Sequence, residues 1–269
     1  MTASQNPFHW RGTVTEPSAF IGREHEFAAL FTRLATLGCV SVVGDRRIGK
    51  SSLLYQAAAR APKQLGESCR AVYLDLLSAR HHTLDGLLGS ILQGLTGTDG
   101  GMLGFTGSDK LTTFEAAVRS LRRTGALPVV FLDEFECLST RPQEFGDNLL
   151  ESWRSLGNDS QIAFVTSSAQ PLDQVTKGSG LTSAFYNIFA QIRLGEFVDR
   201  ETRAFAQYAA RAGMLEPADE VFLLRVGGNH PLRLQVAAWH LFEARRAGAV
   251  DFGVLEQAAK QEVSSMMKG

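Results

Sequence analysis

The strongest constraint on this chain of 269 residues is the glycine-rich segment from Gly44 to Ser52, which reads GDRRIGKSS. It matches the phosphate-binding pattern G-x-x-x-x-G-K-[ST] at every defined position. Gly44 and Gly49 permit backbone angles that a side chain would forbid, so successive N–H groups can point at phosphate oxygens. Lys50 supplies a positive charge for the β- and γ-phosphates, and the hydroxyl of Ser51 can ligate Mg²⁺. The pattern predicts a nucleotide site built from Gly44, Asp45, Arg46, Arg47, Ile48, Gly49, Lys50, Ser51 and Ser52.

The sequence on either side of this loop fits the same prediction. Residues 39–43 are apolar and indicate a buried strand, and residues 51–60 indicate a helix. A strand, then the loop, then a helix is the arrangement that a phosphate-binding loop requires. The positive end of the helix dipole would then face the phosphates. The alternative is a glycine-rich turn that happens to carry a lysine.

Composition limits the class of protein. The chain is 44% hydrophobic, its formal net charge is −1 and its pI is near 6.6, so the whole chain has no general attraction to nucleic acid or to an anionic membrane. Three cysteines without C-x-x-C spacing indicate neither a disulfide framework nor a zinc site, which fits a reducing cytoplasm. We expect a cytoplasmic protein without a signal peptide or a membrane span.

Strand patterns alternate with helical patterns through the first two thirds of the chain. This alternation predicts a parallel sheet with helices on both faces. Beyond residue 199, helices centred near Phe205, Phe222, Val236 and Leu255 follow without a strand between them. We therefore predict an α/β P-loop NTPase fold followed by a small all-helical lid, divided into an N-terminal arm at 1–19, an α/β ATPase domain at 20–196 and a helical lid domain at 197–269.

Residues 94–107 carry six glycines among Thr, Asp and Ser residues. This composition predicts a mobile loop, either a simple connector or a segment that becomes ordered on a partner.

A pair of acidic residues forms the second candidate element. Residues 129–132 are apolar, and Asp133 and Glu134 follow them directly. A strand that ends here would place Asp133 where its carboxylate can hold Mg²⁺ through water. Glu134 could then orient or deprotonate the water that attacks the γ-phosphate. Glu136 is the competing carboxylate, and we expect it to be a surface residue.

Taken together, these motifs resemble the AAA+/STAND branch of P-loop ATPases, and most of all the archaeal-type ATPases and related STAND NTPases. The resemblance covers residues 20 to about 245. The segments that carry it are FIGRE at 20–24, the loop at 44–52, FLDE at 131–134, FVTSS at 164–168, RL at 193–194 and GGNHP at 227–231.

The resemblance implies roles for further residues. Phe20, Ile21, Gly22 and Arg23 would line the adenine pocket, and Ser167 would be a polar sensor of the γ-phosphate. The helical region would be a lid, in which Pro231 starts a helix whose N-terminus faces the nucleotide. Independently of the family, two glycines followed by a proline indicate a hinge and a helix start.

Several residues keep two interpretations. His230 either reaches the phosphates or is a neighbour of the helix cap. Arg233 either reaches the phosphates or is a solvated charge. Arg46 and Arg47 either pair with carboxylates or a neighbouring subunit, or are plain surface charge. The sensor stretch lacks the arginine that STAND proteins commonly carry, so no arginine finger is assigned among the candidates Arg141, Arg154 and Arg193.

The family implies ATP or ADP with Mg²⁺ as cofactors and slow ATP hydrolysis. The first functional hypothesis is a nucleotide-gated switch, in which ATP closes the lid and creates a surface for homo-oligomerisation or for a protein effector. The second is an ATPase acting on DNA, similar to origin-recognition or transposition-regulator ATPases, against which the near-zero net charge argues. The third is a nucleotide binder without turnover, against which Glu134 argues.

Overall fold

The computed structural model describes residues 6–8, 10–97, 109–178, 180, 182–214 and 216–267. The chain forms two compact units. The sheet unit comprises His25–Gly44 and Leu53–Leu194, and the helical unit comprises Met1–Glu24, Asp45–Ser52 and Gly195–Gly269. The three domain ranges expected from the sequence stay a prediction.

A parallel five-stranded sheet organises the sheet unit, with the strand order β2-β3-β4-β1-β5. Every residue of β1 and β4 is buried, which is typical of central strands covered on both faces. The predicted fold class is therefore confirmed. The strands are β1 Cys39–Val43, β2 Cys69–Asp75, β3 Leu127–Asp133, β4 Ala163–Ser168 and β5 Phe189–Arg193.

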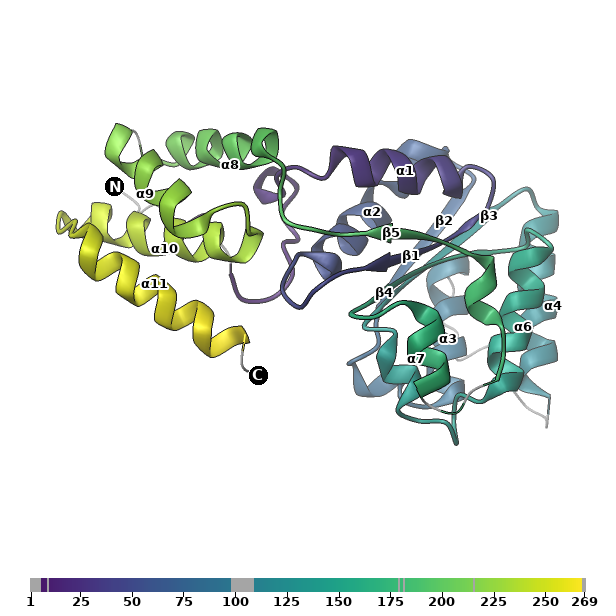
Figure 1. The fold of residues 1–269 in the computed structure, drawn as a ribbon. Coiled ribbons are helices and arrows are strands. Elements are labelled where there is room, and N and C mark those ends of the chain that lie inside the picture. The colour runs from purple at the N-terminus through teal and green to yellow at the C-terminus, as the bar shows by residue number, and fades with distance from the viewer. Residues whose placement is uncertain are drawn as a thin grey trace. The chain divides into compact units, whose positions relative to one another are not determined.

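Helices cover both faces of this sheet, with α1 and α2 on one side and α3, α4 and α6 on the other (Figure 1). The core on the second side joins leucines of α3 to aromatic residues of the sheet and of α6. Within it, Trp153 stacks on Phe164 with ring centroids 4.8 Å apart. The helices are α1 Glu24–Leu34, α2 Lys50–Leu65, α3 Leu84–Thr96, α4 Lys110–Arg123, α5 Glu136–Ser139, α6 Asp147–Asn158 and α7 Leu172–Gly178.

The loop expected from residue 94 begins later than predicted. Helix α3 continues through Thr96 and ends at Gly97, which caps it with a left-handed φ of 70°. Gly94 belongs to the helix because it faces β2 at close range: a Cβ atom added there would lie 2.7 Å from Cβ of Val72. The glycine thus serves packing rather than flexibility. Residues 98–107 of the predicted loop lie outside the described residues.

Four helices form most of the helical unit, and its described residues from 195 onward contain no strand, as the sequence predicts. Their core includes Phe205, Phe222, Leu234 and Leu255. No described helix of the chain combines the length and the apolar character needed to cross a membrane. The helices are α8 Asp199–Arg211, α9 Pro217–Gly227, α10 Pro231–Ala247 and α11 Phe252–Met267.

Part of the predicted N-terminal arm is packed against these helices. Phe8 is only 2% exposed, and its ring contacts those of Phe205, Tyr208 and Phe242 at centroid distances of 5.5 to 6.2 Å. Trp10 of the same segment also contacts Trp239, with ring centroids 6.2 Å apart, so two aromatic residues anchor the arm.

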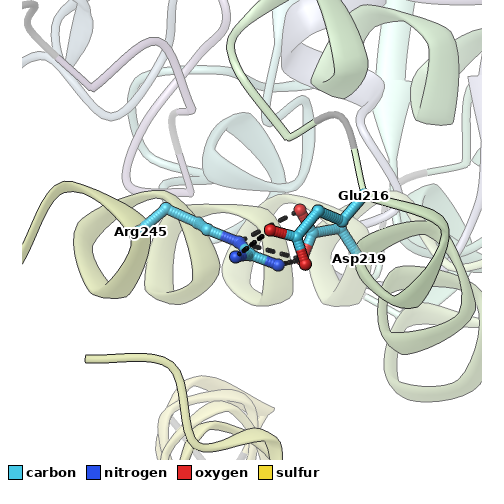
Figure 2. A network of polar contacts seen from close by, with 3 residues as sticks. All are labelled: Glu216, Asp219 and Arg245. Carbon is cyan, nitrogen blue, oxygen red and sulfur yellow. Dashed lines mark hydrogen bonds and ion pairs between the residues drawn. The ribbon is translucent and has the colours of Figure 1, made fainter. Parts of the chain in front are cut away.

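A partly buried cluster of one arginine and two carboxylates joins α9 to α10 (Figure 2). Arg245 in the last turn of α10 donates to Asp219 at 2.6 Å and to Glu216 at 2.7 Å. Asp219 lies in the first turn of α9 and is 1% exposed. The acidic and basic residues also stand at the helix ends whose dipole charges they complement. These two carboxylates raise the pKa of the Arg245 guanidinium, chiefly through the hydrogen bonds to Asp219.

Candidate functional site

The candidate site starts at the carboxyl edge of the sheet, where α/β proteins place their ligands. Strand β4 lies between β1 and β3, and Val43 at the end of β1 is in register with Ser168. Leu132 pairs with Thr166, so the next residues of the two strands, Asp133 and Ser167, are also neighbours. The strand order therefore brings the acidic pair, the sensor serine and the start of the phosphate loop to one edge.

Asp133 is held by two hydroxyl groups. It is 3% exposed; its Oδ1 accepts a short hydrogen bond from Ser167 Oγ, and its Oδ2 accepts one from the Tyr73 hydroxyl at 2.8 Å. Each carboxylate oxygen can accept more than one hydrogen bond, so Asp133 retains the capacity to bind a water molecule. Tyr73 was not found by sequence reasoning, because an aromatic residue in a strand gives no signal beyond its packing.

Glu134 has a left-handed backbone, with φ of 56°. Its N–H donates to Ser167 Oγ at 3.1 Å, and its side chain is partly exposed. A non-glycine residue held in this region costs about 1–3 kcal/mol, which the surrounding structure must supply. Ser167 thus fixes both members of the acidic pair, donating to Asp133 and accepting from Glu134.

Glu136 is not the solvated surface residue that the sequence suggested. Its Oε1 accepts a hydrogen bond from the N–H of Ala169, and its Oε2 is buried with no hydrogen-bond partner. The reason is local: α5 begins at Glu136, directly after the turn at Glu134, and brings this carboxylate to the segment that follows β4.

Of the two loop glycines, Gly49 and not Gly44 has the left-handed backbone that a side chain would disfavour. Gly49 has φ of 101°, and a Cβ atom added there would meet no heavy atom within 4 Å. Lys50, at the start of α2, is 8% exposed, and its ammonium group donates to the carbonyl of Asp45 at 3.0 Å. The lysine therefore lies across the loop. Arg46 and Arg47 are exposed, and Arg47 also has a left-handed φ of 65°.

The turn at Phe20–Glu24 belongs to the same unit as the phosphate loop. Gly22 and Arg23 both have positive φ, 77° and 70°. Phe20 and Ile21 are partly exposed, whereas Arg23 is 3% exposed. The role of this turn in lining an adenine pocket stays a prediction.

The start of α10 lies in this unit as well. Pro231 is the first residue of the helix, as predicted, and His230 is its N-cap, because Nδ1 accepts from the N–H of Leu232 at 3.2 Å. His230 is 5% exposed. Burial lowers its pKa, and the charge of Arg233 lowers it further, while Glu196 and Asp45 act in the opposite direction. The imidazole is therefore neutral near pH 7, which its role as a hydrogen-bond acceptor requires.

A parallel sheet flanked by helices, a glycine-rich loop after β1 and an acidic pair after β3 define a P-loop NTPase. Residues 34–175 match the profile of a family described as "AAA domain". This match covers more than half of the chain, and the chain belongs to that family.

Solved structures share the fold. The ORC2 protein of Aeropyrum pernix, solved with ADPNP and ADP, matches with a TM-score of 0.71 and 18% identity over 96% of this chain and 71% of its own. A Walker-type ATPase of Pyrococcus abyssi matches with a TM-score of 0.67 and 17% identity over 96% of this chain and 77% of its own. The ORC1 protein of Aeropyrum pernix in complex with DNA matches with a TM-score of 0.61 and 17% identity over 92% of this chain and 66% of its own. A search of curated proteins finds no match.

Proposed function

We propose that this chain binds ATP with Mg²⁺ and hydrolyses it slowly, as a switch whose helical unit responds to the nucleotide. The observation that carries the proposal is the arrangement at the end of β3, where Ser167 holds a buried Asp133 and a strained Glu134 together. A surface turn that only closes a strand needs neither the buried carboxylate nor the left-handed glutamate.

The residues for binding fit this substrate. The main-chain N–H groups of the loop and the ammonium group of Lys50 bind the phosphates, and Ser51 and Asp133 offer one hydroxyl and one carboxylate for the cation. Within the described residues, no group of three His, Cys, Asp or Glu side chains is arranged for a metal. Few protein ligands suit Mg²⁺, which binds through one or two carboxylates together with substrate phosphates. When bound, this ion would neutralise charge on the β- and γ-phosphates.

Glu134 is the proposed base that orients or deprotonates the attacking water. Asp133 cannot take this role as readily, because both of its oxygens already accept hydrogen bonds from Ser167 and Tyr73. No observation assigns an arginine finger, and an arginine finger contributes roughly 10³–10⁵ to the rates of related phosphoryl transfers. We therefore expect slow turnover.

The position of His230 and Pro231 supports the proposed switch. They start α10, in the same unit as the phosphate loop, and the charge of Asp45 in that loop acts on His230. A nucleotide that reaches the loop would contact the N-terminus of α10 and favour one arrangement of the helical unit. We infer that this arrangement exposes a surface for a second copy of the chain or for a protein effector.

Two substitutions test the ATPase proposal. Lys50→Ala should abolish ATP binding in calorimetry, because the loop loses its ammonium group.

Glu134→Gln should preserve ATP binding and reduce phosphate release at least about 100-fold, as expected for loss of a catalytic base. Glu151→Gln is the matched control on the exposed face of α6. Undiminished phosphate release from Glu134→Gln would remove Glu134 from its role.

The second candidate is an ATPase that acts on DNA. The fold of an ORC1 protein solved in complex with DNA favours it, while the net charge of −1 does not. Fluorescence anisotropy with labelled duplex DNA at several salt concentrations separates the two proposals. Binding that requires ATP and weakens steeply with salt would favour the DNA-acting ATPase, because phosphate contacts release counterions.

A further inference from the structure

We propose that Arg23 is a positioning residue that orients the phosphate loop through the carbonyl of Ile48 and ties it to the start of the helical region. This inference rests on the proposed function, since it concerns the loop that would bind ATP. It gives Arg23 a different role from the base contact that family resemblance implies.

The contacts of the guanidinium carry the proposal. A single nitrogen, Nη2, donates to the carbonyl of Ile48 at 3.2 Å and to the carbonyl of Gly195 at 2.7 Å. Both of its hydrogens are thereby directed to main-chain oxygens. The guanidinium carbon also lies 4.8 Å from the ring centroid of Phe197. Arg23 therefore connects a residue of the phosphate loop with two residues of the segment that leads into α8.

The backbone explains how this contact reaches the ligand side of the loop. The peptide bond between Ile48 and Gly49 is trans, because the described chain contains no cis peptide. In a planar trans peptide the carbonyl and the N–H point in opposite directions. When Arg23 holds the carbonyl of Ile48, it directs the N–H of Gly49 to the opposite side of this peptide. Donation to the carbonyl also polarises the peptide and strengthens that N–H as a donor.

Arg23 is itself held in place by α8. The main-chain N–H of Arg23 donates to Oε1 of Glu201, and Oε2 of the same carboxylate accepts from the N–H of Val198 at 3.0 Å. Glu201 is 5% exposed. It approaches the turn so closely that a Cβ atom added to Gly22 would lie 2.9 Å from its Oε1. A glycine at position 22 thus leaves room for the carboxylate of Glu201. The arginine that follows it then supplies the guanidinium that binds the carbonyls of Ile48 and Gly195.

The two roles of Arg23 differ in a measurable way. A residue that contacts adenine affects only ligands that contain the base. A residue that orients the Gly49 N–H affects every ligand with phosphates, including inorganic pyrophosphate, by a similar factor. Arg23→Met removes the donor and keeps an unbranched apolar chain, and Arg203→Met is the matched control at an exposed arginine of α8.

The experiment measures competition of Mg-ADP and Mg-pyrophosphate against a fluorescent ADP analogue. We expect Arg23→Met to weaken both ligands about tenfold, the effect of losing one hydrogen bond to a charged group. Arg23→Lys, which retains the charge, should recover part of this loss. In steady-state ATP hydrolysis, Arg23→Met should raise KM, while kcat stays within about twofold of the wild-type value. A loss confined to ADP, or no loss for either ligand, would overturn the proposal.

Hydrogen exchange separates this inference from the proposed function. In the protein without nucleotide, Arg23→Met should accelerate exchange of the amides at 45–52, and Arg203→Met should not. If the wild-type protein binds no nucleotide, the ATPase proposal fails. The exchange measurement still tests the role of Arg23, because unchanged exchange at 45–52 in Arg23→Met would refute that role. Should Arg23→Met fail to fold, Phe197→Leu removes only the ring beneath the guanidinium, and we expect about a threefold loss for both ligands.

Discussion

At the residue scale, backbone strain marks the same positions as the chemistry. Five described non-glycine residues have positive φ. Three of them, Arg23, Arg47 and Glu134, lie in the turn, the loop and the acidic pair of the candidate site. Such conformations persist only where neighbours hold them, and they gather at functional sites. Here the neighbours of two are identified: Glu201 and two carbonyls for Arg23, and the hydroxyl of Ser167 for Glu134.

Ser167→Ala tests this hydroxyl directly. The substitution removes the donor to Asp133 and the acceptor for the Glu134 N–H, so we expect kcat to fall about 100-fold, as a misplaced catalytic group does, while ATP affinity changes less than about threefold. The rate of phosphate release in a single turnover measures this loss of activity. Ser183→Ala is the control, because its buried hydroxyl has no hydrogen-bond partner. Equal rates for the two variants would contradict the role of Ser167.

His230 predicts a pH dependence of stability. Its pKa lies below the ordinary value of 6.5 in the folded chain, so between the two values the unfolded state binds more protons. The stabilising contribution is therefore complete above pH 6.5 and is lost as the pH falls through the folded pKa. Asn at this position keeps an oxygen that caps the helix and does not titrate.

Urea unfolding at pH 7.5 and pH 5.5 is the measurement. The wild-type protein should lose more stability between these pH values than His230→Asn. His240, whose pKa burial also lowers, contributes equally to both proteins and cancels in the comparison. An identical loss in both would show that His230 is not the group concerned.

At the element scale, helix α3 is fitted to β2 by a missing side chain. Gly94→Ala gains about 1 kcal/mol of helix propensity but forces a methyl group against Val72, and overpacking costs about 1–3 kcal/mol. We expect net destabilisation, measured by thermal or urea unfolding. Gly89→Ala in the same helix is the matched control, since its added Cβ meets nothing within 4 Å and should stabilise the protein. A more stable Gly94→Ala would contradict this packing.

The N-terminal segment is also understood at this scale. Phe8 is buried among aromatic residues of the helical unit, and the N–H of Val14 donates to Ser52 Oγ at 2.9 Å. Ser52 lies in the first turn of α2 and is the last residue of the phosphate-loop segment 44–52. Phe8 and Val14 therefore tie this segment to both the helical core and the phosphate loop.

At the scale of the whole molecule, the switch proposal predicts self-association controlled by ATP. Glu134→Gln should accumulate the ATP-bound state, because it binds without hydrolysis. With ATP and no DNA, light scattering should show larger species for this variant than with ADP. Lys50→Ala is the negative control, because it should bind neither nucleotide. A shift that requires added DNA would instead support the DNA-acting ATPase.

Much of the fold could be predicted from the sequence, because local patterns carry it. The strand at 39–43, the apolar strand that ends at the acidic pair, the helices of the last third and the phosphate loop follow from short-range periodicity and from glycine at defined positions. Helix α7 does not follow from these patterns, because it spans only seven residues and ends in glycine. The end of α3 was misplaced, since the partner that explains Gly94 is a strand residue distant in sequence.

Taken alone, the sequence determined which residues belong to the loop and to the acidic pair, since these depend on spacing along the chain. Only the tertiary structure decided what holds them: Tyr73 and Ser167 on Asp133, Ala169 on Glu136, and Arg23 on Ile48 and Gly195. Each of these contacts joins residues more than 20 positions apart, across neighbouring strands or between a turn and a distant loop. Such pairings depend on strand order and helix packing, which no local pattern encodes.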